Sequence, residues 1–371
     1  MGLTKIRLGD YIRRSTVNNR NLQYGEDLIV GVNNTGVFTT PKGSTTGVNL
    51  KPYKIVETGA FVYNPTRLDL GSIAYRTEGL CIVSHLYMVF YLTDEGQKII
   101  DPQWLFIYFR RKEFQREVTF RNFGSQRPEF NFEDMSDIVI PLPPIDIQQK
   151  YVAVYNAMLA NQQSYERGLE DLKLTIDATI EKYKGKHTEK ISLEQLITEC
   201  DLRNSDNKFH IVYGVNKDKL FMPTVTSGAD LTKYKVVQKH QFACNLMHVG
   251  RDVAIPVALN HMAESFIISP AYLVFEINTE EIIPEFFMIW FSREETDRMA
   301  WFMCDSNIRG GMDKRRFYDM TIPVPSKKEQ LALVEMYEAL RIRKEINEKL
   351  KTQIKDLCPI LIKGSIEEAQ R

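Results

Sequence analysis

The stretch IPLPPIDIQQ, at residues 140–149, has a close counterpart in IPVPSKKEQL, at residues 322–331. Both contain the pattern Ile-Pro-x-Pro followed after four further residues by glutamine, and both stand directly before a long segment with helical periodicity. Proline favours an extended conformation in the residue before it, so the pattern predicts a strand end that leads at once into a helix. The same signal at two places predicts a structural module that occurs twice.

The similarity between the two halves extends well beyond this pattern. Pro141 and Pro323 are 182 residues apart, and at the same offset WLFIYFRRKEF (104–114) aligns with FFMIWFSREET (286–296). The chain therefore contains two copies of about 185 residues, each a strand-rich part followed by a long helix. Matched residues at nearly this offset are Tyr53 with Tyr234, Phe61 with Phe242, Asn64 with Asn245, Ser84 with Ser269, Tyr87 with Tyr272 and Phe90 with Phe275.

The strand-rich parts predict two mixed α/β domains within an α+β fold. The alternation in LYMVFYL (86–92) and AYLVFEI (271–277) is typical of strands. In each copy the spacing of apolar residues also predicts one continuous helix, at residues 102–121 and 284–303, with an apolar face and arginines on the opposite side. The expected division of the chain is a domain at 1–143, a helix at 144–186, a second domain at 187–325 and a C-terminal helix at 326–371.

The two long helices are expected to pair with each other. Apolar residues recur every three or four positions from Val154 to Tyr183 and from Val334 to Leu361, which suits a narrow seam rather than broad burial. A helix of about 40 residues is about 60 Å long. We therefore expect an antiparallel coiled coil that carries the two domains at opposite ends. The alternative is two helices that each pack only on their own domain.

The starts of both helices carry capping signals. Ser326 and Glu329 have the spacing of a capping box, in which the two side chains each accept a hydrogen bond from a backbone N–H. Asp146 is the corresponding candidate cap of the first helix. Both helices are thus expected to begin within a few residues of the repeated pattern.

The composition limits the function. The 371 residues include 48 Lys and Arg against 48 Asp and Glu, and this balance disfavours nonspecific coating of nucleic acid, which depends on phosphate neutralisation. Residues 187–325 are acidic, with 15 basic and 19 acidic side chains. The five cysteines lack zinc-ligand spacing, so no metal site is expected. No apolar stretch suggests a signal peptide or a membrane span, and we expect a cytoplasmic protein.

The doubled Ile-Pro-x-Pro-x4-Gln pattern, each time followed by a long helix, resembles the specificity subunit of type I restriction-modification enzymes. The resemblance covers essentially the whole chain. It implies two target-recognition domains that each read one half of a bipartite double-stranded DNA site. It also implies that the spacer helices dock two methyltransferase (M) subunits, that motor-nuclease (R) subunits join for restriction, and that this subunit is not catalytic. S-adenosylmethionine, ATP and Mg would then bind to the partner subunits, and no cofactor to this one.

Two polar loops in each copy are candidate DNA-reading segments. RNFGSQRPEFN (121–131) and NIRGGMDKRR (307–316) lie just before the repeated pattern, and their glycines allow close backbone approach. NPTRLDLGS (64–72) and NLMHVGRD (245–252) form a second matched pair. Glutamine pairs well with adenine, and arginine with guanine. The candidate DNA-binding residues are Arg67, Arg121, Gln126, Arg127, His248, Arg251, Arg309, Lys314, Arg315 and Arg316. A further set, expected to contact phosphates or to lie on the surface, is Arg110, Arg111 and Arg116.

Catalytic interpretations find less support. The sequence from Asn64 to Arg67 only partly matches the Asn-Pro-Pro-aromatic signature of adenine methyltransferases, since the second proline and the aromatic residue are missing. No glycine-rich loop suited to S-adenosylmethionine and no Walker motif is present. Two alternatives stay open. One is the same DNA reader in a system whose partner fuses nuclease and methyltransferase. The other is a scaffold whose repeated domains bind protein or carbohydrate.

Overall fold

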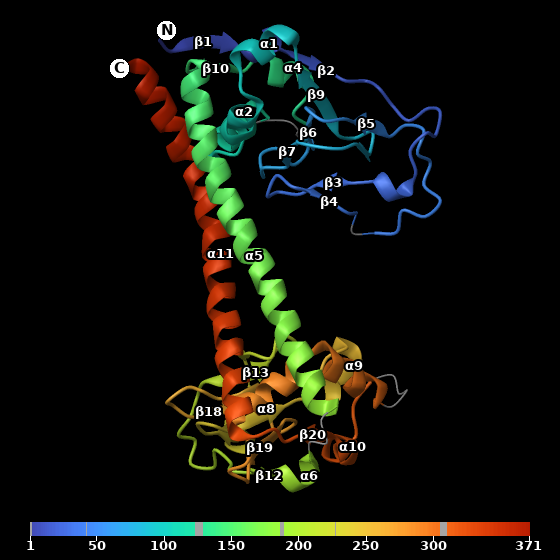
Figure 1. Ribbon diagram of the computed structural model, residues 1–371, viewed down its shortest axis with the longest axis vertical. Coiled ribbons are helices and arrows are strands. Elements are labelled where there is room, and N and C mark those ends of the chain that lie inside the picture. Colours follow the sequence, from blue (N-terminus) through green and yellow to red (C-terminus); the bar gives the residue numbers. More distant parts are fainter. Residues whose placement is uncertain (1, 42, 123–128, 186–188, 227, 305–309) are drawn as a thin grey trace. The chain divides into compact units, whose positions relative to one another are not determined.

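The computed structural model describes all residues except 1, 42, 123–128, 186–188, 227 and 305–309 (Figure 1). The chain divides into two compact units: unit 1 contains Met1–Tyr165 and Ile346–Arg371, and unit 2 contains Glu166–Glu345. Each unit holds one strand-rich domain together with one half of each long helix. These helices are α5 (Ile145–Gly185) and α11 (Lys327–Gln370).

Unit 1 is built around an antiparallel sheet with strand order β2-β9-β6-β7. In the core beneath this sheet Phe61 stacks on Phe90, with the ring centroids 5.0 Å apart. The strands of this sheet are β2 (Ile12–Arg14), β9 (Met88–Leu92), β6 (Phe61–Tyr63) and β7 (Ile73–Tyr75). Three further antiparallel pairs complete the strands of the unit: β1 (Thr4–Arg7) with β10 (Val139–Leu142), β3 (Gly31–Val32) with β4 (Phe38–Thr39), and β5 (Lys54–Val56) with β8 (Cys81–Val83). Its short helices are α1 (Asp94–Ile99), α2 (Pro102–Phe109), α3 (Lys112–Arg121) and α4 (Phe132–Ser136).

Unit 2 repeats this arrangement. Its sheet of order β12-β19-β16-β17 corresponds to β2-β9-β6-β7, and Phe242 stacks on Phe275 with centroids 5.1 Å apart, as Phe61 does on Phe90. The strands of this sheet are β12 (Ile197–Glu199), β19 (Leu273–Ile277), β16 (Phe242–Cys244) and β17 (Val257–Leu259). A second sheet contains, in spatial order, β14 (Phe221–Pro223), β13 (Val212–Val215), β18 (Phe266–Ile268) and β15 (Lys235–Val237). A separate pair joins β11 (Lys190–Ser192) to β20 (Thr321–Pro323). The helices are α6 (Leu193–Leu196), α7 (Val249–Asp252), α8 (Pro284–Phe291), α9 (Glu294–Phe302) and α10 (Lys314–Asp319). The predicted internal repeat and mixed α/β fold are confirmed.

The repeated pattern has a structural explanation in its glutamine. The Gln148 side chain is fully buried; its amide nitrogen donates to the carbonyl oxygens of Ile99 (2.8 Å) and Pro143 (2.7 Å), and its oxygen accepts from the N–H of Asp101 (2.8 Å). One side chain therefore satisfies three backbone groups. It ties the start of α5 to the loop that leads into α2, while the prolines shape the exit from β10.

Gln330 makes the same three bonds in the second copy. Its amide nitrogen donates to the backbone carbonyl oxygens of Glu281 (2.7 Å) and Pro325 (2.8 Å), and its oxygen accepts from the N–H of Ile283 (2.9 Å). Each partner lies 182 positions after its counterpart in the first copy. Hence the sequence pattern is retained in both copies because it encodes one hydrogen-bonded clamp.

The two long helices pair in an antiparallel manner within each unit. In unit 1, Lys150 of α5 binds Glu368 of α11 (2.9 Å), whereas further along α5 Gln162 donates to Asn347 (3.0 Å). In unit 2, the second half of α5 and the first half of α11 share a core that includes Ile176, Ile180 and Leu333. Figure 1 shows the helices side by side. The predicted pairing is confirmed.

Two details of the helices differ from the sequence prediction. Each predicted continuous helix is broken, because the backbone is extended at Arg111, between α2 and α3, and at Arg293, between α8 and α9. The break accompanies a change in burial: α2 is apolar and largely buried, whereas α3 buries only Phe114 and Val118. Val154, predicted in the helix seam, is 47% exposed.

The capping predictions have different outcomes. The capping box at Ser326 is confirmed, since the Glu329 carboxylate accepts from the Ser326 N–H (3.0 Å) and the Ser326 hydroxyl accepts from the Glu329 N–H (3.4 Å). The predicted cap at Asp146 is wrong. α5 already begins at Ile145, and Asp146 lies inside its first turn. There its carboxylate still interacts favourably with the positive end of the helix dipole.

Candidate nucleic-acid interface

The structure brings the two candidate loops of each copy together. In unit 1, the N–H of Phe130 donates to the carbonyl oxygen of Pro65 (3.0 Å). In unit 2, the N–H of Met312 donates to the carbonyl oxygen of Leu246 (2.8 Å), which is the corresponding bond. Segments that are far apart in the sequence are therefore in contact in each copy.

The matched asparagines Asn64 and Asn245 shape the first of these loops. The side-chain oxygen of Asn64 accepts from the N–H of Thr66 (3.1 Å), and that of Asn245 accepts from the N–H of Met247 (3.0 Å). Such a bond lets the side chain mimic a backbone turn and reverses the chain direction. In unit 1 the turn leaves Arg67 exposed. The asparagine that resembled part of a methyltransferase signature thus forms a turn here.

Two glycines bring the loops of unit 2 into backbone contact. The N–H of Gly250 donates to the carbonyl oxygen of Gly310 (2.6 Å), and a Cβ on Gly250 would lie only 2.5 Å from that oxygen. Gly310 also has φ +57°, a left-handed conformation that favours glycine. The contact places Arg251 next to Gly310. Gln126, Arg127 and Arg309 lie outside the described residues.

The remaining candidates differ in how their charges are used. The side chains of Arg67 and Arg315 are exposed and have no hydrogen-bond or ion-pair partner among the described residues. The other candidates each have a protein partner: Arg121 pairs with Glu117 (3.0 Å), Arg251 with Asp252 (2.8 Å), Lys314 with Glu199, Arg316 with the carbonyl oxygen of Met303 (2.6 Å), and His248 Nδ1 with Asn245 Nδ2 (3.3 Å). A side chain that is paired within the protein must leave its partner before it reaches a phosphate or a base, so Arg67 and Arg315 are the most accessible donors.

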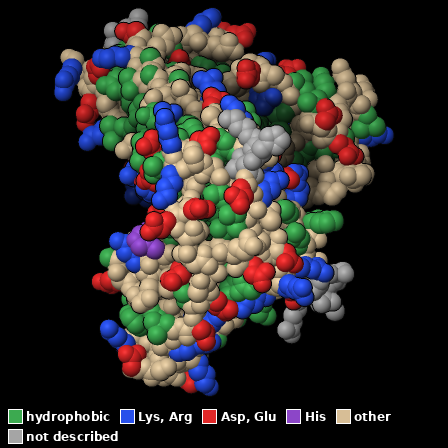
Figure 2. All heavy atoms as spheres, turned by 60° about the horizontal axis from the view of Figure 1, so that its bottom comes forward, with side chains coloured by type: hydrophobic (Ala, Val, Ile, Leu, Met, Phe, Trp, Pro, Cys, Tyr) green, Lys and Arg blue, Asp and Glu red, His purple; other side chains and the backbone are tan. Residues whose placement is uncertain are grey.

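These ion pairs also tune their members. The hydrogen bond from Arg251 holds the pKa of Asp252 below its usual value. The hydrogen bond to Glu199 raises the pKa of Lys314. In the pairs Arg251–Asp252 and Lys314–Glu199, the carboxylate partly cancels the positive field of the cation. On the face drawn in Figure 2, acidic and basic side chains are interspersed among the described residues.

Arg110, expected on the surface or at a phosphate, is in fact buried. Its side chain is 6% exposed, and its guanidinium donates to the carbonyl oxygens of Gly71 and Asn34. Burial lowers the pKa of this arginine. Arg110 thus ties the loop after β6 to the β3–β4 hairpin. Arg111 and Arg116 also make protein contacts: Arg111 lies over the Tyr108 ring, 3.8 Å from its centroid, and Arg116 pairs with Glu113 (3.2 Å).

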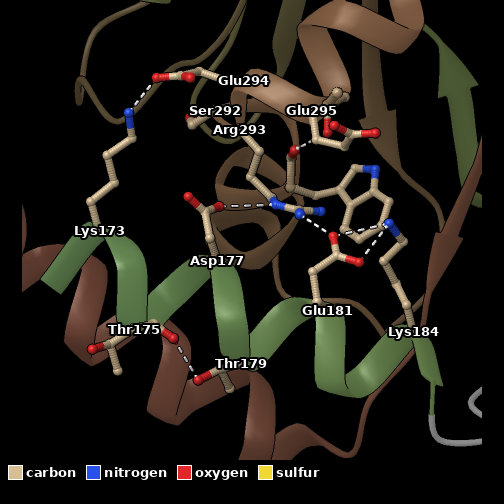
Figure 3. A network of polar contacts seen from close by, with 12 residues as sticks. Lys173, Thr175, Asp177, Thr179, Glu181, Lys184, Ser292, Arg293, Glu294 and Glu295 are labelled. Atoms are coloured by element: carbon tan, nitrogen blue, oxygen red, sulfur yellow. Dashed lines mark hydrogen bonds and ion pairs between the residues drawn. The ribbon is translucent and has the colours of Figure 1, made fainter. Parts of the chain in front are cut away.

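The position of Arg111 is taken in unit 2 by Arg293, a buried side chain at the centre of an ion network (Figure 3). Its guanidinium binds Asp177 (3.1 Å) and Glu181 of α5 and lies over Trp290, 5.2 Å from the ring centroid. Although burial alone would raise the pKa of Glu181, hydrogen bonds from Lys184 and Arg293 hold it below its usual value. This network fastens the second half of α5 to the α8–α9 junction.

A cavity of about 760 Å³ adjoins this network and is lined by Asp177, Glu181, Lys184, Val253, Arg293, Glu294, Glu295, Asp297 and Arg298. The carboxylates there are largely held by basic side chains. No group of at least three His, Cys, Asp or Glu side chains that could hold a metal occurs in the described parts of the chain. The chemistry of this site suits attachment of α5 rather than binding of an anionic polymer.

Two hairpin turns that the sequence analysis did not single out adopt one shape. In the β3–β4 turn the Asn33 side chain accepts from the N–H of Val37 (3.0 Å), and in the β13–β14 turn Asn216 accepts from that of Leu220 (2.9 Å). The residue before each of these donors is left-handed: Gly36 has φ +77° and Lys219 has φ +62°. Only glycine adopts this conformation without strain.

The strained Lys219 is compensated by its side chain. Its ammonium group is buried, donates to the Asp297 carboxylate (2.6 Å) and to the carbonyl oxygen of Ile255 (2.9 Å), and has a pKa lowered by burial. In unit 1 the corresponding hairpin has Gly36 and is held by Arg110 instead. Each hairpin is thus anchored by one buried cation. In unit 1 this cation, Arg110, lies outside the hairpin, whereas in unit 2 Lys219 belongs to the hairpin itself.

Comparisons with known proteins place this architecture. Residues 5–170 match the family model described as "Type I restriction modification DNA specificity domain". The first copy of the repeat is therefore similar to this family of DNA specificity domains. That family is generally non-catalytic. A search of curated proteins found no match.

Solved structures match the fold over nearly the whole chain. A chain from a study of complex assembly and conformational transition in a type I R-M system has TM-score 0.56 and 15% identity, covering 98% of this chain and 97% of that one. The type I S subunit from M. genitalium has TM-score 0.55 and 12% identity, covering 98% and 96%. The HsdS subunit from Thermoanaerobacter tengcongensis has TM-score 0.46 and 15% identity, covering 98% and 96%. Among the described residues, no helix has the length and hydropathy needed to span a membrane.

Proposed function

We propose that the chain is the DNA-reading specificity subunit of a type I restriction-modification complex. The observation that carries the proposal is the duplicated surface: in each copy the same backbone bond joins the two candidate loops, and accessible arginines stand beside it. A ligand with two related halves fits a duplicated reader, because a discontinuous DNA site offers one half-site to each copy. Arginine is also the side chain most often used to read guanine in the major groove.

Partner subunits complete the proposed complex. The paired long helices dock two methyltransferase subunits, and motor-nuclease subunits join for restriction of double-stranded DNA. Methylation and cleavage, with S-adenosylmethionine, ATP and Mg, belong to those partners, and this chain binds no cofactor of its own. The likeness in fold to a chain from a type I R-M system supports this assignment.

Methylome sequencing tests the proposal directly. Cells that express this chain with the methyltransferase subunit encoded beside it should carry methylated adenines in one bipartite motif with a fixed spacer. Cells without this chain should lack that methylation. If the assembled pair bound DNA with an affinity that depended neither on sequence nor on salt, the reader would be ruled out and a scaffold role favoured.

Arg67→Ala and Arg315→Ala should each weaken recognition of a different half-site. Loss of a bidentate base contact costs about 1–3 kcal/mol, which corresponds to at least a five-fold fall in affinity at that half-site. Competition binding with DNA altered in one half-site at a time measures this effect. Lys98→Ala, a charge removal on the exposed side of α1, is the control and should leave both half-sites unchanged. Equal loss on all DNA sequences would instead identify phosphate contacts.

A further inference from the structure

The helices α3 and α9 each expose a phenylalanine at the same repeat position. Phe120 is 82% exposed and Phe302 is 84% exposed, and the two residues are 182 positions apart. Both units bury other phenylalanines completely, including Phe114 in α3 itself. A single exposed aromatic ring needs no explanation. An aromatic ring left exposed at the same position in both copies does, because the two copies have diverged at many other positions.

A matched ion pair accompanies each exposed ring. Arg116 pairs with Glu113 (3.2 Å) in α3, and Arg298 pairs with Glu295 in α9. Residues at i, i+3 and i+7 share one side of a helix. We call this side the Phe face: Glu113, Arg116 and Phe120 in unit 1, and Glu295, Arg298 and Phe302 in unit 2. Both copies therefore present the same three side chains in the same order.

Other matched positions of the two copies differ in charge. The positions of Arg315 and Arg316 in α10 are occupied by Glu133 and Asp134 in α4. Likewise, the first residue of α3 is Lys112, whereas α9 begins with Glu294. A phosphate-binding surface would need positive charge in both copies, but the charge at these matched positions changes sign while the ring and its ion pair stay. This pattern favours a protein ligand over DNA.

We infer that the Phe face is a docking site for a partner protein that binds in two copies, one to each recognition domain. Resting on the proposed function, this partner is the methyltransferase subunit. Its complementary surface has an apolar socket for the phenylalanine ring and polar groups that meet the arginine–glutamate pair. Aromatic and arginine side chains surrounded by polar groups are the usual anchors of protein interfaces.

A groove beside Phe302 adds room for such contact. It has a volume of about 390 Å³ and is lined by Phe302, Met303, Arg316 and Asp319. A side chain of the partner that packs on the ring would enter this groove. The Phe face in unit 1 carries the same ring, so the socket on the partner serves both copies.

Substitution of each ring separately tests the inference. The full chain, as wild type, Phe120→Ala, Phe302→Ala or both, is co-purified with the methyltransferase subunit encoded beside it, and native mass spectrometry reports the stoichiometry. Wild type should hold two methyltransferase subunits. Each single variant should bind one of them at least ten-fold more weakly, and the double variant should lose most of both. Leu86→Ala and Val225→Ala, at side chains 67% and 96% exposed, are matched controls that should retain both subunits.

Each outcome decides the inference. Wild-type stoichiometry and affinity in both single variants would overturn it. Normal assembly combined with weakened binding of one DNA half-site would also overturn it and assign the Phe face to DNA. Failure of the wild-type chain itself to bind two methyltransferase subunits would instead refute the proposed function. Because both rings lie on the surface, thermal melting of the variants should match wild type, and a fall in melting temperature would indicate a structural role.

Discussion

Gln148→Glu should destabilise unit 1 by about 4 kcal/mol, and Gln330→Glu should do the same in unit 2. The substitution keeps the size of the side chain but removes both donors. The carbonyl oxygens of Ile99 and Pro143 then face a carboxylate oxygen instead of an N–H group. Each buried polar group left without a partner costs about 1–3 kcal/mol, and burial of the carboxylate adds to this.

Chemical unfolding of each variant measures the loss, and hydrogen exchange at the start of α5 or α11 locates it. Gln149→Glu is the matched control: the same change at the neighbouring residue, which is exposed, should alter stability by less than about 0.5 kcal/mol. Equal stability of Gln148→Glu and Gln149→Glu would show that the clamp does not stabilise the fold.

The pH dependence of Gln148→Glu gives a second check. Burial beside two carbonyl oxygens should raise the folded-state pKa of the new carboxyl group above its unfolded value of about 4.3. A group whose folded pKa is raised stabilises the protein most below its unfolded pKa, and this contribution is lost as pH rises through the folded pKa. The variant should therefore approach wild-type stability in acid and fall furthest behind at neutral pH.

The sequence could predict the repeat and its structural consequences. Matched patterns at a nearly constant offset are visible in a single sequence, and they predict that the two copies share one fold. The apolar spacing of the long helices predicts a seam, and two such helices in one chain predict a pair. The clamp made by Gln148 was visible as a pattern, but its three partners could not be named, because they are backbone groups whose positions depend on the loop before α2.

Charged side chains were the least predictable part of the candidate site. Arg110 and Arg111 are adjacent residues at the end of a helix, and both look like surface positions. In the fold, Arg110 is buried because carbonyl oxygens from two distant loops converge on it. Similarly, Lys314 is held by Glu199, 115 residues earlier in the chain. Local patterns carry little information about such long-range pairs, so the sequence alone could not separate accessible cations from committed ones.

Breaking the buried Lys219–Asp297 ion pair in unit 2 should cost much more stability than breaking a surface ion pair. Lys219→Met should destabilise the protein by about 3–5 kcal/mol, because it leaves the Asp297 carboxylate largely buried without its cation. Asp297→Asn should cost less, since an amide oxygen can still accept from the Ile255 N–H. The double variant should lose less than the sum of the two, with a coupling of at least about 1 kcal/mol in a double-mutant cycle. Lys217→Met, at an exposed residue two positions away, is the control for removal of a lysine charge.

A third variant at the same position separates charge from backbone strain. Lys219→Gly removes the cation as Lys219→Met does, but glycine accepts φ +62° without strain, as Gly36 does in the first copy. Lys219→Gly should therefore be more stable than Lys219→Met by about 1 kcal/mol, and less stable than wild type because Asp297 stays unpaired. Equilibrium unfolding of both variants gives the difference. Equal stabilities would mean that the left-handed conformation carries no strain. A glycine variant as stable as wild type would mean that the ion pair does not hold the hairpin.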